Sequence, residues 1–201
     1  MQYYNDIITQ KSFVYLQTIK KRFDFILIGG WAVFLYSKSL KSKDIDIIID
    51  YDVLAKLKEE GELVKNERLH QYEINEGNFD IDIYVAHYSQ LGVDIEEIKK
   101  SAILKDGFLV PALEVLFLMK LFAWHNRRGS AKGQKDELDI LSLSFLPEFD
   151  WGRYLKFVQE YNFLEYHQEF VGLLKSTHNV KELSVNNQAM AKLRKRILAE
   201  I

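Results

Sequence analysis

Two short segments of the sequence carry aspartates where a β-strand is expected, and this pattern restricts the folds open to the chain. Residues 43–49 read KDIDIII, and residues 79–85 read FDIDIYV. Successive side chains of a strand point to opposite faces of a sheet, so the two aspartates of each segment share one face. Aspartate is depleted in strands, and neighbouring carboxylates repel one another unless a cation neutralises them. The pattern therefore predicts a divalent-metal site on a sheet.

A pair of glycines precedes the first of these segments. Residues 26–28 are isoleucine, leucine and isoleucine, which predicts a short buried strand that runs through Gly29 and Gly30 into a helix. Backbone N–H groups at such a junction can approach an anion, and the helix N-terminus adds positive potential. An isolated pair of glycines is more often a tight turn. Next to the aspartates, this pair predicts a phosphate-binding turn.

Each aspartate also has an ordinary structural interpretation. Asp44 and Asp46 can face solvent on an antiparallel strand, but the isoleucines at 45 and 47–49 favour a buried strand. Asp80 can lie on the exposed face of a hairpin, whereas Asp82 lies deeper in its apolar segment. If the two strands are neighbours, Asp82 completes a cluster of three carboxylates suited to Mg²⁺ binding and general-base catalysis. The sequence leaves Asp80 and Asp82 as alternatives for the third position.

The composition of the 201 residues restricts the classes of function. The net charge of −2 argues against a protein that coats nucleic acids nonspecifically, although a local basic patch remains compatible with RNA binding. The absence of cysteine excludes disulfides and cysteine-based zinc sites. The most apolar stretch, 115–124, contains Lys120 and is too short to span a membrane. The N-terminus lacks the pattern of a signal peptide, so we expect a cytoplasmic protein without a membrane partner.

The pattern along the chain predicts an α/β first half and a helical second half. The predicted domains are residues 1–110 and 111–201, with Pro111 in the first turn of a helix that reaches about Asn126. A basic loop is expected at 127–133. The expected strands lie at 25–28, 44–49, 70–74, 79–85, 103–104 and 108–110. The other expected helices lie at about 5–21, 31–37, 53–60, 94–101, 135–145, 151–160, 163–174 and 181–199.

The order of the motifs resembles the nucleotidyltransferase signature of the DNA polymerase β superfamily. That signature has two glycines after a hydrophobic residue, an Asp-x-Asp strand, and a later aspartate on another strand. Here 13 residues separate Gly30 from Asp44-Ile-Asp46, and Asp82 follows. The resemblance covers roughly residues 23–145. It implies an α+β nucleotidyltransferase fold, a small mixed twisted sheet with flanking helices, followed by a helical C-terminal half.

The resemblance also implies an activity and roles for the residues. Members of the superfamily transfer a nucleoside monophosphate from an NTP, such as ATP, to an acceptor hydroxyl with two Mg²⁺ ions, for which Mn²⁺ can substitute. Asp44 and Asp46 would hold the metals and the triphosphate, and Asp82 would be the third ligand and the base. Gly29 and Gly30 would cradle the triphosphate, and Lys43 is a further candidate nucleotide contact.

A second segment, residues 120–141, is similar to the downstream helices of abortive-infection-type nucleotidyltransferases. That group includes the toxin half of type IV toxin–antitoxin pairs, in which a helix lysine and a later lysine–aspartate pair close over the nucleotide. Lys120 and Asp136 match these positions. Because a triphosphate beside three carboxylates needs counter-charge, the other cations of the segment are candidate phosphate contacts. They are Arg127, Lys132 and Lys135. The alternative is a solvated basic turn between two helices.

The acceptor of the nucleotide stays open at this stage. Transfer to RNA, such as a tRNA end, would fit a toxin-like activity with a partner antitoxin, and the basic segments 127–135 and 192–196 would serve it. Transfer to a small molecule or to a protein hydroxyl is favoured by the net charge of −2. A non-catalytic nucleotide-binding or antitoxin-like partner is the third alternative, against which the three retained aspartates argue.

Overall fold

The computed structural model describes residues 6–61 and 63–201, so the predicted helix start at residue 5 lies outside the described residues. The chain divides into two compact units, one up to Ala112 and one from Leu113 to Ile201. The assignment of residues 1–110 as a nucleotidyltransferase core and of 111–201 as a helical C-terminal region stays a prediction. None of the described helices is long and apolar enough to cross a membrane.

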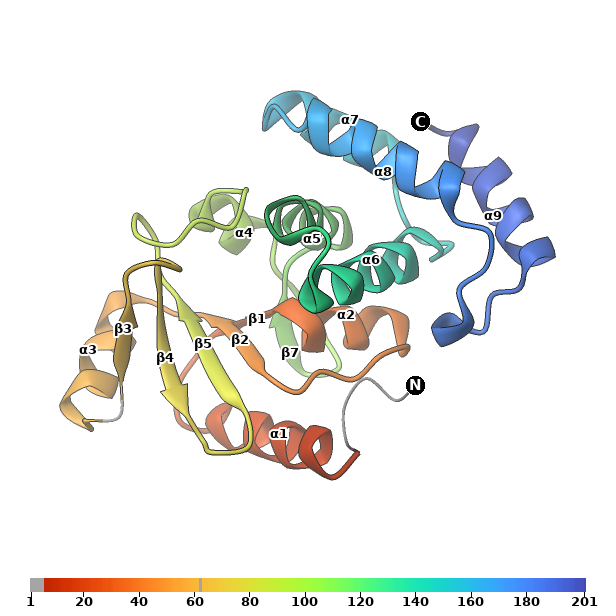
Figure 1. The fold of residues 1–201 in the computed structure, drawn as a ribbon. Coiled ribbons are helices and arrows are strands. Elements are labelled where there is room, and N and C mark those ends of the chain that lie inside the picture. The colour runs from red at the N-terminus through yellow and green to blue at the C-terminus, as the bar shows by residue number, and fades with distance from the viewer. Residues whose placement is uncertain (1–5, 62) are drawn as a thin grey trace. The chain divides into compact units, whose positions relative to one another are not determined.

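The first unit is built on one sheet of seven strands in the order β3-β4-β5-β2-β1-β7-β6 (Figure 1). Pairs β2–β5 and β1–β7 are parallel, whereas β1–β2, β3–β4, β4–β5 and β6–β7 are antiparallel. The strands are β1 (Ile26–Ile28), β2 (Ile45–Ile48), β3 (Val64–Asn66), β4 (Gln71–Asn75), β5 (Asp80–Tyr84), β6 (Ile103–Lys105) and β7 (Phe108–Val110). This arrangement confirms the predicted small mixed sheet.

The two aspartate-bearing strands lie side by side near the middle of this sheet. On β2, Ile45 and Ile47 are fully buried. On β5, Ile83 is fully buried and Ile81 is 2% exposed. These isoleucines occupy every second position, so they share the face of the sheet opposite to the aspartates. Burial of the isoleucines therefore fixes the register that aligns the aspartates, because a slip by one residue would turn every isoleucine to the other face.

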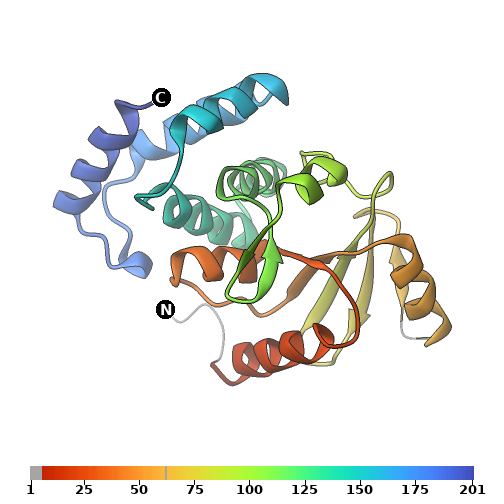
Figure 2. The same ribbon diagram turned by 180° about the vertical axis from the view of Figure 1, so that it is seen from behind.

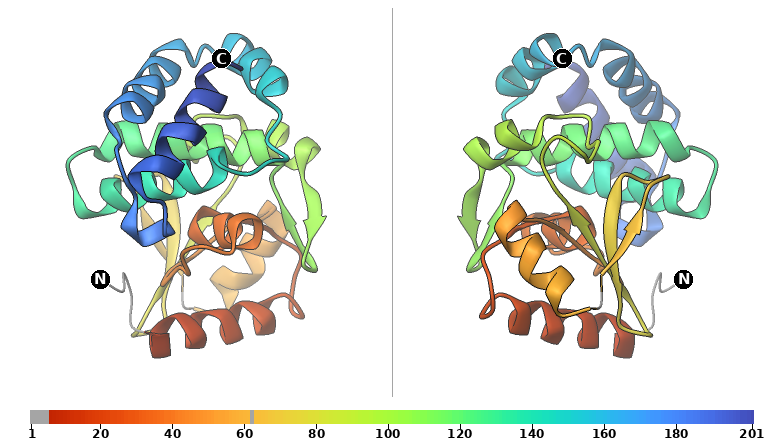
Figure 3. Two further views of the ribbon diagram at one scale, coloured as in Figure 1. Left: turned by 90° about the vertical axis from the view of Figure 1, so that its right-hand side faces the viewer. Right: turned by 90° about the vertical axis from the view of Figure 1, so that its left-hand side faces the viewer.

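The described residues of the first unit also form the helices α1 (Asp6–Ile19), α2 (Gly29–Ser37), α3 (Tyr51–Glu59) and α4 (Ile95–Ser101). Trp31 of α2 joins α1 to α2, since its indole N–H donates to the Ser12 hydroxyl at 3.0 Å and its ring lies 5.0 Å from the Phe13 ring. Figure 3 shows α1 in red and α2 in orange-red. Figure 2 brings the green β6–β7 hairpin to the front.

The second unit is helical and packs around one phenylalanine. Its helices are α5 (Leu113–Arg127), α6 (Ala131–Ser144), α7 (Trp151–Glu160), α8 (Leu164–Ser176) and α9 (Asn187–Leu198), with a short 3₁₀ turn η1 (Lys181–Leu183). Phe117 of α5 is fully buried, and its ring meets the rings of Phe149, Tyr154 and Phe170 edge-on at 5.0–5.3 Å. This aromatic cluster ties α7 and α8 to α5, because edge-to-face pairs add to the free energy of apolar burial.

Two predicted helix starts are wrong, and local capping explains both. The helix expected at 135 begins at Ala131, since the Ser130 hydroxyl accepts the Gly133 N–H at 3.0 Å. Lys132 therefore lies in the first turn of α6, not in the predicted basic loop. The helix expected at 181 begins at Asn187, because Ser184 adopts φ +56° and Asn186 caps the following helix.

Candidate active site

Strands β2 and β5 bring two of the predicted catalytic aspartates directly opposite one another. The parallel register pairs Asp46 with Asp82. Side chains of opposite residues on neighbouring strands lie on the same face, so both carboxylates share one face of the sheet. Asp44 lies just before β2, where its Oδ1 accepts the backbone N–H of Asp80 at 3.2 Å. The sheet thus brings Asp46 and Asp82 together and leaves Asp44 at the start of the same region.

Gly29 lies directly against Asp46. A Cβ atom on Gly29 would come within 2.0 Å of Asp46 Oδ2, and Gly29 has a φ of +63°. The register of β1 with β2 pairs Ile28, the last residue of β1, with Asp46. Helix α2 begins at the next residue, Gly29, and therefore starts beside this carboxylate. The N-terminus of a helix carries positive potential, which stabilises an adjacent carboxylate. The first glycine of the pair is therefore needed to make room for Asp46, a requirement that the sequence did not reveal.

Glu73 of β4 extends the row of carboxylates, and sequence reasoning missed it. The antiparallel register pairs Glu73 with Asp82, so Asp46, Asp82 and Glu73 lie in line across β2, β5 and β4. We call these three residues the acidic row. The signal that could have found Glu73 is the alternation of polar residues at 71, 73 and 75 in a predicted strand of the same hairpin.

Neutral donors approach the acidic row. The side-chain amide of Gln71 donates to Asp82 Oδ1 at 2.8 Å and to Glu73 Oε1 at 3.0 Å. The Asn66 amide also donates to Glu73 Oε1, at 2.7 Å. The Tyr84 hydroxyl donates to Asp46 Oδ1 at 3.4 Å. These groups stabilise carboxylates without adding positive charge.

Asp80 and Lys43 are predicted site residues that lie outside the acidic row. Asp80 is paired in register with Asn75, whose amide donates to Asp80 Oδ1 at 2.6 Å, next to the turn of the hairpin. The register therefore places Asp82, and not Asp80, opposite Asp46. The Lys43 ammonium lies 3.7 Å from Asp44 Oδ1, which gives Asp44 a cationic neighbour.

A metal site built from protein side chains alone needs three or more ligand atoms that lie close to one another. Within residues 6–61 and 63–201, ligand atoms that all lie within 4.8 Å of one another belong to His125, Glu165 and Glu169, and the aspartates of β2 and β5 do not form such a group. Mg²⁺, however, commonly takes one or two carboxylates and completes its shell with phosphate oxygens and water. Asp46 and Asp82, opposite one another and beside a helix N-terminus, offer two carboxylates to an ion whose shell is completed by water or phosphate oxygens.

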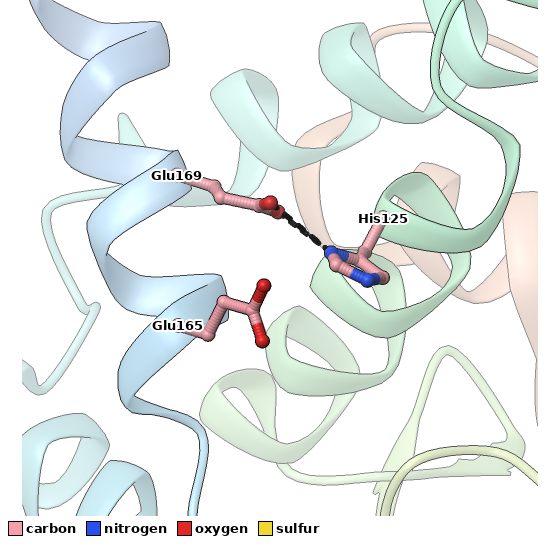
Figure 4. Close-up of side chains that lie close together, drawn as sticks. All are labelled: His125, Glu165 and Glu169. Carbon is pink, nitrogen blue, oxygen red and sulfur yellow. Dashed lines mark hydrogen bonds and ion pairs between the residues drawn. The ribbon is translucent and has the colours of Figure 1, made fainter.

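The group around His125 is better described as an ion-pair network between α5 and α8 (Figure 4). His125 Nδ1 lies 3.0 Å from Glu169 Oε2, and the Arg128 guanidinium forms an ion pair with the same carboxylate. Burial would raise the pKa of Glu169, but the hydrogen bonds from His125 and Arg128 outweigh it and lower the pKa. Two basic side chains thus already engage one of the three potential ligands.

Lys120, a predicted nucleotide contact, is buried in the second unit. It is 6% exposed, and its ammonium lies 2.7 Å from Asp139 Oδ2 and 3.2 Å from Asp136 Oδ1. The Arg127 guanidinium donates to Asp136 Oδ1 at 3.0 Å. Burial alone would lower the pKa of Lys120, but the two aspartates outweigh it and raise the pKa above its ordinary value. We call these four side chains the buried ion cluster.

The remaining predicted nucleotide contacts divide between the units. Gly29, Gly30 and Lys43 belong to the first unit, whereas Lys120, Arg127, Lys132, Lys135 and Asp136 belong to the second. Lys132 is exposed and Lys135 is half-buried, both in the first two turns of α6. The second unit thus joins Lys120, Arg127 and Asp136 into one cluster, and the role of each residue toward a nucleotide stays a prediction.

Similarity to solved structures, rather than to known sequences, identifies the fold of this chain. No protein-family model matches the sequence, and no curated protein matches it at a significant level. Solved structures do match. The structure of ANT(2'')-Ia in complex with adenylyl-2''-tobramycin has a TM-score of 0.52 and 12% sequence identity, over 83% of this chain and 99% of that chain. The chain has the nucleotidyltransferase fold.

Two further solved structures match this chain with lower TM-scores. An antigenic nucleotidyltransferase-like protein from Paracoccidioides brasiliensis is 17% identical, with a TM-score of 0.44 over 90% of this chain and 97% of that chain. JHP933 from Helicobacter pylori is 13% identical, with a TM-score of 0.49 over 96% of this chain and 91% of that chain.

The contact between Gly29 and Asp46 predicts a large effect of a single methyl group. We expect Gly29→Ala to lower the free energy of unfolding by about 2–5 kcal/mol, from about 1–2 for the left-handed φ and about 1–3 for the overlap with Asp46. Urea unfolding followed by tryptophan fluorescence measures it. Gly77→Ala is the matched control, since Gly77 has φ +75° but no neighbour within 4 Å. Equal losses for the two variants would contradict the steric role of Gly29.

The buried ion cluster predicts that Lys120 matters for stability. We expect Lys120→Met to lower the free energy of unfolding by about 3–5 kcal/mol, because the buried Asp139 would lose the cation beside it and Asp136 would lose one of its two cations. Urea unfolding checks this loss. Lys132→Met, at an exposed site of the same unit, should change it by less than about 0.5 kcal/mol. Unchanged stability of Lys120→Met together with weakened NTP binding would instead support a nucleotide contact.

Proposed function

We propose that this chain is a metal-dependent nucleotidyltransferase that moves a nucleoside monophosphate from an NTP to an acceptor hydroxyl. The observation that carries the proposal is the register of the sheet, which sets Asp46 directly opposite Asp82 while Gly29 and the N-terminus of α2 lie against Asp46. Carboxylates on one face supply the oxygen ligands that Mg²⁺ prefers, and the adjoining helix N-terminus attracts phosphate. The nucleotidyltransferase fold of the chain is consistent with this proposed activity.

The residues of the first unit have distinct parts in the proposed reaction. Mg²⁺ bound with the NTP would neutralise charge on the α-phosphate and on the departing pyrophosphate. Asp46 and Asp82 would hold it, with Asp44 as a further ligand at the start of the same region. Gly29, Gly30 and Lys43 would bind the triphosphate, since backbone N–H groups and an ammonium supply counter-charge.

The chemical step transfers the nucleoside monophosphate, through its α-phosphorus, to the acceptor. The acceptor oxygen forms a bond to the α-phosphorus as the bond from that phosphorus to the bridging oxygen of the β-phosphate breaks, and pyrophosphate leaves. Asp82 accepts the proton of the acceptor hydroxyl as general base. The rate enhancement would come from holding the two reactants in line and from neutralising charge on the α-phosphate and the pyrophosphate.

In the second unit, the proposed nucleotide contacts differ in their exposure and in their ion pairs. Lys132 is exposed at the start of α6, where an ammonium can reach a phosphate. Arg127 is only partly exposed and shares Asp136 with Lys120. We propose that Lys120 and Asp136 act by orienting Arg127, with Lys132 and Lys135 as direct phosphate contacts.

The acceptor divides the proposal into two cases. RNA, such as a tRNA end, would place the chain among toxin-like enzymes with a partner antitoxin. Lys192 and Lys195 of α9 are exposed, which favours RNA. In the same segment, however, the Arg194 guanidinium donates to the Thr177 carbonyl at 3.1 Å and that of Arg196 to the Phe145 carbonyl at 2.9 Å. A small molecule or a protein hydroxyl is the alternative, which the net charge of −2 favours.

The proposal predicts that Asp46→Asn and Asp82→Asn each reduce nucleotide transfer by at least about 1,000-fold, equivalent to about 4 kcal/mol of activation free energy. The assay follows label from each α-³²P-NTP with Mg²⁺ or Mn²⁺ into total RNA, hydroxylated small molecules and protein. Asp80→Asn is the matched control on the same strand and should change the rate by less than about 3-fold. Full activity of either test variant would refute the assignment of that aspartate.

The same assay separates the acceptors. Label in RNA that disappears steeply with added salt would identify RNA, because binding of phosphates releases counterions. Label in a small molecule or a protein with weak salt dependence would identify the alternative. Metal-dependent NTP binding without transfer to any of the three would support the non-catalytic, antitoxin-like role.

A further inference from the structure

One buried amide spans two carboxylates of the acidic row. Gln71 begins β4 and is only 5% exposed. Its single side-chain nitrogen donates to Asp82 on the neighbouring strand at 2.8 Å and to Glu73 on its own strand at 3.0 Å. Gln71 and Glu73 are two residues apart, so they share the face of the sheet on which Asp82 lies. Gln71 therefore uses both of its amide hydrogens on this pair of carboxylates.

The chemistry of the donor is suited to a metal site. Asp82 and Glu73 are direct cross-strand neighbours, and like charges in that arrangement destabilise a sheet. A lysine at position 71 would relieve the repulsion, but its positive charge would also oppose an incoming Mg²⁺. A neutral amide stabilises both carboxylates through hydrogen bonds and leaves their negative charge in place. The glutamine thus holds the carboxylates together without competing with a cation.

Two other amides of the sheet, on β3 and β4, differ from Gln71 in what they reach. The Asn66 amide donates to Glu73, and the Asn75 amide donates to Asp80. Both differ from Gln71, because neither hydrogen bond reaches Asp82, the residue opposite Asp46. Gln71 is the buried member of this set, so its side chain is held in place by packing as well as by its two acceptors.

We propose that Gln71 is a positioning residue, which fixes the orientation of the Asp82 carboxylate so that Asp82 and Asp46 can bind one divalent cation. This inference rests on the proposed function and names a residue outside the carboxylates and glycines of the nucleotidyltransferase signature. A ligand that is held in place by a neighbouring hydrogen bond loses less conformational freedom when it binds a metal. Loss of the Gln71 amide should therefore weaken metal binding while the fold stays intact.

The test is Gln71→Met, which keeps the length of the side chain and removes the amide. Titration with Mn²⁺ alone, with free Mn²⁺ measured by electron paramagnetic resonance, gives the dissociation constant without any acceptor or turnover. We expect the constant to rise about 10–100-fold, as is typical when a supporting hydrogen bond to a metal ligand is lost. In the transfer assay, kcat should fall while the KM for NTP changes by less than about 3-fold, since Gln71 supports the reacting end of the site.

Two further variants keep the inference falsifiable. Gln71→Asn retains an amide that is one methylene too short to reach both carboxylates, so it should weaken Mn²⁺ binding even if Gln71→Met unfolds. Asn75→Ser removes the equivalent amide from Asp80 on the same two strands and should leave Mn²⁺ affinity within about 2-fold. Circular dichroism and thermal unfolding confirm that each variant is folded.

The possible results separate this inference from the proposed function. If Asp82→Asn abolishes Mn²⁺ binding but folded Gln71→Met and Gln71→Asn bind Mn²⁺ as the wild type does or more tightly, the positioning role is refuted and the metal site stands. An equal loss in Asn75→Ser would also refute it, because the effect would then be general to the hairpin. If Asp82→Asn binds Mn²⁺ with wild-type affinity, the metal site itself is wrong and the inference falls with it.

Discussion

Repulsion between carboxylates is the constraint on which the first unit depends. Asp46, Asp82 and Glu73 lie directly opposite one another across three adjacent strands, an arrangement that costs free energy in the absence of compensation. The N-terminus of α2 beside Asp46 offsets part of this cost, and so do the neutral donors Gln71, Asn66 and Tyr84. The buried isoleucines on the opposite face hold the strands in register, so the carboxylates cannot separate without loss of the core.

In the buried ion cluster of the second unit, cations and not neutral donors stabilise the carboxylates. Lys120 and Arg127 engage Asp136 and Asp139, so two cations balance two carboxylates inside the α5–α6 hairpin. Removal of one partner from such a buried cluster is strongly destabilising, which gives it a structural part whatever its role toward a nucleotide. This difference matters for function, because carboxylates that bind a metal ion must keep their negative charge. Neutral hydrogen-bond donors leave that charge in place, whereas a paired cation cancels it. Charge balance therefore distinguishes the acidic row from the buried ion cluster.

Much of the sheet could be predicted because its strands carry a strong local signal. The alternation of aspartate and isoleucine at 44–49 and 80–84 marks two strands that carry aspartates on one face and buried isoleucines on the other, and both strands are found. Strand β3 gave no such signal, since its three residues are largely exposed and too few to show a period. The start of α9 was missed for a related reason, because the left-handed Ser184 that ends η1 has no distinctive sequence pattern.

The sequence by itself determined that aspartates would share the face of a strand and that glycines would join a strand to a helix, since both follow from residue spacing along the chain. Only the tertiary structure decided which side chains meet across strands. The pairing of Asp46 with Asp82, the contact of Gly29 with Asp46 and the reach of Gln71 to Asp82 all depend on register between segments distant in sequence. Register is set by burial of the whole sheet, an energy to which every strand contributes and which no single segment encodes.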